Sequence, residues 1–542
     1  MKRRGHGAHA GRRPRPQAGG LRAAGPARTA RTEPAASPAP HSVGRPLALA
    51  ILAGAGLGVS FLDFRLFVVP WLALPLLLAS AERASPRRAF WYGAAAGATG
   101  ITIAFSWLVY AVRVFGGFSL PVALAIVAAP IAWMALELAI FLGVLAWLGP
   151  VPLGLAAPVV FTALEFLFPS LFPWRLAHAE YRVPVLLQSG DLAGPSLLGF
   201  AIVWSAAGAL ASVHAVAEGG PDVLRRALTA LAPPVLLVAA LVGYGEWRIA
   251  AIAAERSAAP GRRVGVVQGN VSVRRKGERS FFARNLDEYR ALSRALLPDV
   301  DLVIWPETVV QDRIDATRTR VTDHDSPFPG AARPLLFGGL AGEHDASGER
   351  LFNSAFLLRH GEIVGRYDKR VLVPFGEYMP LGDRFPMLRR LSPGTSHFAA
   401  GTTPALLTLD TDARIAALIC YEDVIPAPAR DAVAQGATLL VNLTNDAWYG
   451  DSAEPVQHQA LAIWRAVETR RDLVRSTNTG LTSVIAATGE VIAELPTFAP
   501  STLVADVRLL RGRTVYATVG DAFAWSVVIA CAALVARRWR AR

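Results

Sequence analysis

Long apolar runs dominate the first 250 residues of the chain, and one more lies close to its C-terminus. A helix that spans a bilayer needs roughly 17–25 predominantly apolar residues, and these runs approach or exceed that length. We therefore predict seven transmembrane helices and, near the C-terminus, an eighth. The predicted spans cover residues 46–62, 66–81, 88–112, 118–149, 151–172, 195–217, 226–246 and 520–536.

Between residues 250 and about 515 the pattern changes, because charged residues return and short β-type runs alternate with turns and helical stretches. Strands interleaved with helices and hairpins predict one α/β domain with sheet at its centre. Buried strands are expected over 263–270, 302–305, 335–339 and 438–442, hairpins over 353–368 and 404–420, and helices over 282–296 and 455–472.

The composition is typical of a membrane protein, since 53% of the residues are hydrophobic and only 18% are charged. The net charge of +13 comes largely from arginines in the first 45 residues and in the last few. The first 45 residues are rich in Arg, Pro, Ala and Gly, so we expect a disordered, uncleaved tail. Nucleic-acid binding is one interpretation of such a tail, but basic residues that flank apolar segments favour cytoplasmic anchoring.

The basic residues also predict an orientation in the membrane. The loop at 82–88 and the loop that ends at Arg225 and Arg226 would be cytoplasmic, as would both termini. Seven spans then place the α/β domain on the opposite, extracytoplasmic side. We therefore expect a cytoplasmic tail (1–45), a seven-span membrane domain (46–246), an extracytoplasmic domain (247–515) and a final span with a basic end (516–542).

The chain has two cysteines, Cys420 and Cys531, which excludes a disulfide framework and a cysteine-based zinc site. Cys420 ends an apolar strand-like run, and Tyr421 and Glu422 follow it directly. An unpaired thiol at the end of a buried strand is either a small core residue or a nucleophile. As a nucleophile it needs a group that removes its proton and one that stabilises the charge that develops.

Two residues are candidates to assist such a thiol. Glu307 lies at the mouth of the predicted strand 302–305, where partial burial would raise the pKa of its carboxyl group toward that of a general base. A solvated carboxylate at a strand end is the alternative. Lys369 is one of three lysines among 55 basic residues, and its retention beside Arg370 suggests that an ammonium is required there. Chance survival of one lysine would also explain it.

Polar residues in loops that follow strands are further candidates, because sites are commonly built on such loops. Glu377 lies at the centre of a loop punctuated by Pro and Gly, and Trp448 lies in the loop after the strand 438–442. Charged residues at helical spacing then follow, and we expect them to form a solvated helical face: Arg465, Glu468, Arg471 and Arg475.

Two carboxylates, Glu137 and Glu165, lie within apolar runs. Ionisable residues inside a membrane are costly and often functional. They would face a channel for a lipid headgroup or an amine, or they would pack against a polar group of a neighbouring helix.

Three motifs of the polar half are similar to those of a known superfamily. Glu307 in Trp-Pro-Glu, Lys369 in Tyr-Asp-Lys-Arg and Cys420 in Cys-Tyr-Glu are spaced like the Glu-Lys-Cys triad of the nitrilase (carbon–nitrogen hydrolase) superfamily. The strings at 372–378 and 444–450 resemble its membrane branch, the apolipoprotein N-acyltransferases. The resemblance covers the chain from about residue 46 to its end, and it implies a nitrilase-like αββα sandwich together with eight spans.

The resemblance also implies a role for each motif residue. Cys420 would be the nucleophile that takes an acyl chain as a thioester, Glu307 the general base, and Lys369 the support of the oxyanion. The pocket and assisting residues that it implies are Glu377, Tyr421, Glu422 and Trp448.

The implied reaction is ping-pong acyl transfer from a membrane phospholipid, with phosphatidylethanolamine as the expected donor. The acceptor would be the α-amino group of the N-terminal diacylglyceryl-cysteine of an apolipoprotein. We expect no metal, no other cofactor and no nucleic-acid partner. The enzyme would act as a monomer in the bacterial cytoplasmic (inner) membrane.

Two other functions are compatible with the residues alone. In a membrane-tethered amidase or nitrile hydrolase, water would resolve the acyl-enzyme, but such an enzyme has no need of seven spans beside its pocket. In a scaffold or transporter the thiol would be structural, but few charged residues mark a transport path.

Overall fold

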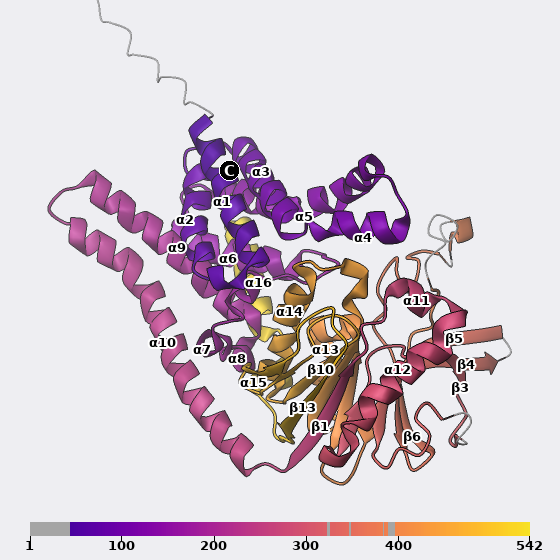
Figure 1. Cartoon of the computed structure of the whole chain (residues 1–542). Coiled ribbons are helices and arrows are strands. Elements are labelled where there is room, and N and C mark those ends of the chain that lie inside the picture. The colour runs from indigo at the N-terminus through magenta and orange to yellow at the C-terminus, as the bar shows by residue number, and fades with distance from the viewer. Residues whose placement is uncertain (1–43, 322–325, 346–347, 383, 388–395, 542) are drawn as a thin grey trace, which may run out of the picture. The chain divides into compact units, whose positions relative to one another are not determined.

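The structure is a computed structural model that describes residues 44–321, 326–345, 348–382, 384–387 and 396–541 (Figure 1). The tail predicted to be disordered, residues 1–45, lies almost entirely outside the described residues, and its disorder stays a prediction.

Helices occupy every apolar segment that the sequence predicts to cross the membrane (Figure 1). They are α1 (Gly44–Leu62), α2 (Val69–Ala81), α3 (Pro86–Ala104) with α4 (Trp107–Gly116), α5 (Leu120–Leu148), α6 (Leu153–Leu167), α9 (Pro195–Glu218), α10 (Val223–Ala258) and α16 (Ala522–Arg540). In the described part of the chain, five helices (α1, α5, α9, α10 and α16) are long and apolar enough to cross a membrane, or up to six if α3 and α4 form one span. The apolar helices α2 and α6 are shorter, with 13 and 15 residues.

The predicted span 88–112 is not one straight helix, because α3 and α4 meet at an angle of 60°. Phe105 leaves the helical backbone at the break, with φ −111° and ψ 28°. Gln457 supplies hydrogen bonds at this point: its Nε2 donates to the carbonyl oxygens of Ala104 (2.8 Å) and Phe61 (2.9 Å), and its Oε1 accepts from Trp107 Nε1 (2.9 Å). A polar side chain from the second half of the chain therefore stabilises a break between two membrane-half helices.

Small residues allow the helices of the membrane half to pack closely. A Cβ added at Gly97 of α3 would lie 2.7 Å from the Cα of Ala135 in α5, and one added at Gly54 of α1 would collide with the carbonyl oxygen of Ala96. Close backbone approach of this kind favours helix association in a bilayer, where apolar burial gives little driving force between helices.

The second half of the chain forms two sheets. The first has the strand order β13-β1-β2-β4-β5-β6, with β3 also paired to β4, and the second has the order β12-β11-β10-β9-β8-β7. The first sheet contains β1 (Gly261–Gln268), β2 (Leu302–Ile304), β3 (Val310–Asp315), β4 (Leu335–Asp345), β5 (Gly348–Arg359), β6 (Glu362–Asp368) and β13 (Ser501–Arg508). The second contains β7 (Leu407–Thr408), β8 (Arg414–Ile419), β9 (Leu439–Thr444), β10 (Leu473–Thr477), β11 (Ser483–Ile485) and β12 (Val491–Glu494).

Apolar side chains of both sheets interdigitate in one core, which includes Val266 and Ile304 of the first sheet and Ile415 and Val441 of the second. Helix α12 (Phe282–Arg294) packs on the outer face of the first sheet. Helices α13 (Pro426–Ala434) and α14 (Glu454–Thr469) cover the outer face of the second. The layers are therefore αββα, as the sequence predicts.

Short helices connect these parts: α7 (Pro184–Leu187), α8 (Gly190–Ala193), α11 (Val273–Gly277) and α15 (Val515–Val519). Asp191 of α8 joins the two halves of the chain, since its carboxylate accepts hydrogen bonds from Tyr244 (2.6 Å), Arg248 (2.9 Å) and Arg470 (2.7 Å).

The predicted solvated face of charged residues is wrong. Arg465, Arg471 and Arg475 are each at most 2% exposed, and Glu468 is fully buried. Helix α14 lies between the second sheet and apolar residues of the membrane half, so both of its sides are covered. Arg475 lies in strand β10 rather than in a helix.

Close packing at Gly97 predicts opposite effects of one substitution at two helical glycines. Gly97→Ala should lower the free energy of unfolding by about 1–3 kcal/mol because the new methyl group collides with α5. Gly243→Ala in α10, where a Cβ meets nothing within 4 Å, should raise it by up to about 1 kcal/mol through helix propensity. Unfolding temperatures in detergent at one scan rate measure both, and equal shifts would contradict the packing argument.

Candidate active site

The three motif residues lie just after the ends of three strands, and the fold brings them together. Glu307 lies three residues after the end of β2, Lys369 directly follows β6, and Cys420 directly follows β8. The Nζ of Lys369 lies 3.8 Å from Oε1 of Glu307, and the charges of both residues act on the Cys420 thiol.

Lys369 is 1% exposed and is paired with a second carboxylate. Its Nζ lies 2.8 Å from Oε2 of Glu377 and 2.9 Å from Oε1 of the same residue. Burial alone would lower the pKa of Lys369, but the negative charges of Glu377, Cys420 and Glu307 together raise it above its ordinary value. The ammonium is therefore charged at neutral pH and is available to stabilise an anion.

Glu307 is 7% exposed and accepts a hydrogen bond from Asn353 Nδ2 at 2.7 Å. Burial raises the pKa of its carboxyl group, and Glu377 adds to the rise, while Lys369 and Lys276 oppose it. A raised pKa is what a general base needs in order to take a thiol proton near neutral pH.

Lys276 is a half-buried cation whose only signal in the sequence is the rarity of lysine. Its Nζ donates to the backbone carbonyl oxygen of Glu307 at 2.5 Å. Burial lowers the pKa of Lys276 to about 8, although the charges of Glu307 and Cys420 oppose that shift.

Cys420 has a backbone φ of 50°, in the left-handed region that residues with a side chain rarely adopt. The turn is stabilised by Asn442, whose Nδ2 donates to the carbonyl oxygens of Cys420 (3.1 Å) and Leu418 (3.2 Å). Burial and the charge of Glu307 raise the pKa of the Cys420 thiol well above its ordinary value, against the opposite effect of Lys369. The resting thiol is therefore protonated and needs a base for any nucleophilic reaction.

Cys420 faces a narrow cavity of about 30 Å³ whose wall comes from both halves of the chain. The polar half contributes Tyr421, Val424, Tyr449 and Leu461, and the membrane half contributes Trp107, Phe172 and Trp174. The cavity is thus mostly aromatic and apolar around one thiol.

The other predicted pocket residues have different positions. Tyr421 lines the cavity and donates a hydrogen bond to the carbonyl oxygen of Leu171. Glu422 is fully buried and does not line it; its carboxylate accepts from the backbone N–H groups of Ile419 (2.8 Å) and Arg370 (2.7 Å). Glu422 therefore fixes the chain beside both Cys420 and Lys369.

Trp448 lies away from this cavity. It is 45% exposed, and its ring packs edge-on against Phe115 at the end of α4, with ring centroids 4.9 Å apart. The neighbouring Tyr449 lines the cavity instead.

Besides Lys276, sequence reasoning missed two further residues of the site. Asn353 donates to both Glu307 and Glu377, and the polar residues elsewhere in strand β5 leave no signal that would single it out. His458 lines the Cys420 cavity from α14. His458 lies in the predicted helix 455–472, but the helical pattern alone does not show that other parts of the protein cover both sides of this helix.

His458 is held between carboxylates. Its Nε2 lies 2.8 Å from Asp423 Oδ1 and its Nδ1 lies 3.0 Å from Asp446 Oδ1. Asp446, Glu454 and His458 each offer a possible metal-ligand atom within 4.8 Å of the others. Both ring nitrogens of His458 already have carboxylate partners, and Arg475 pairs with Asp423.

Comparisons with known proteins agree with this architecture. The family model for Carbon-nitrogen hydrolase matches residues 263–516, and the model for the Apolipoprotein N-acyltransferase N-terminal domain matches residues 53–208. The apolipoprotein N-acyltransferase of Geobacter metallireducens is 32% identical over 91% of this chain and 95% of its own length. The apolipoprotein N-acyltransferase of Azotobacter vinelandii is 33% identical over 86% of this chain and 90% of its own length. A solved structure, Saccharomyces cerevisiae Nit3 of the nitrilase superfamily, has 16% identity and a TM-score of 0.36 over 46% of this chain and 90% of that chain, which is too low to bear on function.

The two-sheet half of the chain thus has the carbon–nitrogen hydrolase fold, here joined to a set of apolar helices. The chain as a whole belongs to the apolipoprotein N-acyltransferase family and is an N-acyltransferase enzyme. Its apolar helices and this family indicate a protein of the inner membrane.

The His458 cluster predicts a pH dependence of stability. Burial would lower the pKa of His458, but Asp423 and Asp446 raise it to about 10, above the unfolded value of about 6.5. The imidazolium therefore contributes fully below pH of about 6.5, and its contribution is lost as the pH rises toward 10. In the wild-type protein the unfolding temperature should therefore fall as the pH rises from about 6.5 to about 10, and His458→Gln should make this fall smaller. His360→Asn, in an exposed turn, should retain the wild-type slope, and an unchanged slope in His458→Gln would contradict the charge assignment.

Proposed function

We propose that this protein transfers an acyl chain from a membrane phospholipid to the α-amino group of an N-terminal diacylglyceryl-cysteine of an apolipoprotein. The observation that carries the proposal is the cavity of Cys420, which is lined by the membrane-half residues Trp107, Phe172 and Trp174. A phospholipid whose tails stay among the apolar helices would present its ester to this thiol. Phosphatidylethanolamine is the proposed donor.

In the first half-reaction Glu307 accepts the proton of the Cys420 thiol, and the sulfur attacks the ester carbonyl of the donor. The ammonium of Lys369 stabilises the oxyanion of the tetrahedral intermediate. Collapse of the intermediate breaks the ester C–O bond, and Glu307 returns the proton to the departing lysophospholipid oxygen. The product on the enzyme is a thioester.

In the second half-reaction the neutral α-amine of the acceptor attacks the thioester. Lys369 again stabilises the oxyanion, Glu307 takes the amine proton, and the C–S bond breaks. The proton then returns to the Cys420 sulfur. Asn353 and Glu377 keep Glu307 and Lys369 in position through the contacts described above.

We further propose an orientation with the two-sheet half outside the cytoplasm and both termini inside it. Basic residues support this arrangement, since Arg225 and Arg226 lie in the first turn of α10 and three arginines end α16. The enzyme would work as a monomer with four regions divided near residues 45, 246 and 515.

The thioester is the first test. Intact mass spectrometry after incubation with phosphatidylethanolamine should show one added acyl mass that is absent in Cys420→Ala. The adduct should disappear when a diacylated lipopeptide with a free α-amine is supplied. No adduct, together with ammonia release from small amides, would refute the proposal in favour of a hydrolase.

The role of Lys369 predicts that an arginine cannot replace it. Lys369→Arg keeps the charge but places a larger guanidinium in a site that is 1% exposed, so the rate of thioester formation should fall about 100-fold or more. The matched control is Arg370→Lys, whose side chain pairs with Asp431 at 3.1 Å and is partly exposed. The control should stay close to the wild-type rate, and a similar loss in both variants would contradict the assignment.

A further inference from the structure

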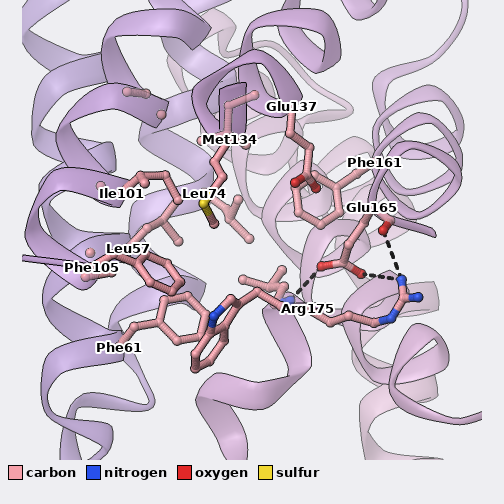
Figure 2. Close-up of a pocket in the computed structure, with 18 residues that line it drawn as sticks. Leu57, Phe61, Leu74, Ile101, Phe105, Met134, Glu137, Phe161, Glu165 and Arg175 are labelled. Atoms are coloured by element: carbon pink, nitrogen blue, oxygen red, sulfur yellow. Dashed lines mark hydrogen bonds and ion pairs between the residues drawn. The ribbon is translucent and has the colours of Figure 1, made fainter. Parts of the chain in front are cut away.

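A second cavity, of about 110 Å³, lies within the membrane half of the chain (Figure 2). Helices α1, α2, α3, α5 and α6 all contribute to its wall. One side is apolar, with Leu57, Phe61, Ile101 and Phe105, and the opposite side carries carboxylates (Figure 2).

The carboxylates are Glu137 of α5 and Glu165 of α6, and Arg175 lies beside them. In the described part of the chain, these three are the ionisable residues that line the cavity. Two carboxylates against one guanidinium leave a formal charge of minus one in apolar surroundings. Such a charge is costly unless a cation or a proton compensates it.

Neither carboxylate is fully satisfied. Glu165 Oε1 accepts from the backbone N–H of Leu176 at 2.6 Å, but its Oε2 is buried without a hydrogen-bond partner and lies 3.9 Å from Arg175 Nη1. Arg175 instead donates to the backbone carbonyl oxygen of Glu165 at 3.1 Å and lies over the ring of Phe166. Within the described residues Glu137 makes no hydrogen bond or ion pair, and its side chain points into the cavity (Figure 2).

The cavity also adjoins the candidate active site. Trp174 lines both this cavity and the cavity of Cys420. A molecule bound against Glu137 and Glu165 would therefore lie one side chain away from the residues around the thiol. Its apolar part would find a matching wall in Phe61 and Phe105, and its cationic part would meet the carboxylates.

We propose that Glu137 and Glu165 form a binding subsite for the primary ammonium group of an amphiphilic substrate. The inference rests on the proposed acyl transfer, in which both substrates carry such a group: the ethanolamine headgroup of the donor, and the α-ammonium of the acceptor before it loses its proton and attacks the thioester. An ammonium has three donors, which suits two carboxylates with free oxygen atoms. The subsite would recognise the positive charge of the ammonium group on either substrate.

The experiment compares Glu137→Gln and Glu165→Gln with the wild-type enzyme in detergent. Both changes remove a charge at nearly constant volume, and a glutamine at 165 retains an oxygen for the Leu176 N–H. The matched control is Glu218→Gln, at the far end of α9, where the carboxylate pairs with Arg226 in an exposed position. Unfolding temperatures check that each variant is folded.

The first measurement is the rate of thioester formation on Cys420 with phosphatidylethanolamine and with phosphatidylglycerol of the same acyl chains. If the headgroup ammonium binds here, the ratio of the two rates should fall about tenfold in Glu137→Gln, as expected for the loss of one charge-assisted hydrogen bond. The second measurement is the KM for a diacylated lipopeptide added to preformed thioester. If the α-ammonium of the acceptor binds here, this KM should rise about tenfold while the donor ratio is unchanged.

Glu218→Gln should leave both quantities at the wild-type value. A donor ratio and an acceptor KM that are both unchanged in folded Glu137→Gln and Glu165→Gln would overturn the subsite, because a proton would then be the compensating charge. Failure of the proposed function gives a different result: the wild-type enzyme would form no Cys420 adduct with either phospholipid.

Discussion

The buried carboxylate of Glu307 and the partly buried carboxylate of Glu377 can share one small volume because the ammonium of Lys369 pairs with both of them. Without that cation the carboxylates would repel each other in a medium of low polarity, and one would have to take up a proton. Asn353 adds a hydrogen bond to each. The position of the candidate base relative to the thiol therefore depends on a charge balance that joins β2, β5, β6 and the loop after β6.

The same balance explains why the thiol can be both inert and reactive. Burial keeps the Cys420 sulfur protonated, while the left-handed backbone presents it at the strand end beside Glu307. A nucleophile that ionises only when a base and a substrate are both in place is protected from side reactions such as oxidation. The aromatic wall from the membrane half gives that thiol an apolar approach.

Much of the fold was predictable because its signals are local. Apolar runs longer than a strand mark the helices, and the motifs at Glu307 and Cys420 follow apolar strands whose burial is evident from composition. The buried charges of α14 were not predictable, since helical spacing of Arg465 and Glu468 is the same whether water or another layer covers the helix. The bend between α3 and α4 likewise depends on Gln457, which is more than 350 residues away in the sequence.

The contacts of Gln457 imply that the two-sheet half of the enzyme cannot be separated from the membrane half without loss of hydrogen bonds. One amide group donates hydrogen bonds to the backbone of α1 and α3 and accepts one from the Trp107 side chain of α4, while its own helix covers the second sheet. A fragment beginning at the first strand would leave this amide without its partners and would lack the tryptophans of the Cys420 cavity wall. The two-sheet half is therefore not an independent module, because apolar helices of the membrane half cover part of its surface. Replacing one half would require matching changes in the residues of the other half that contact it.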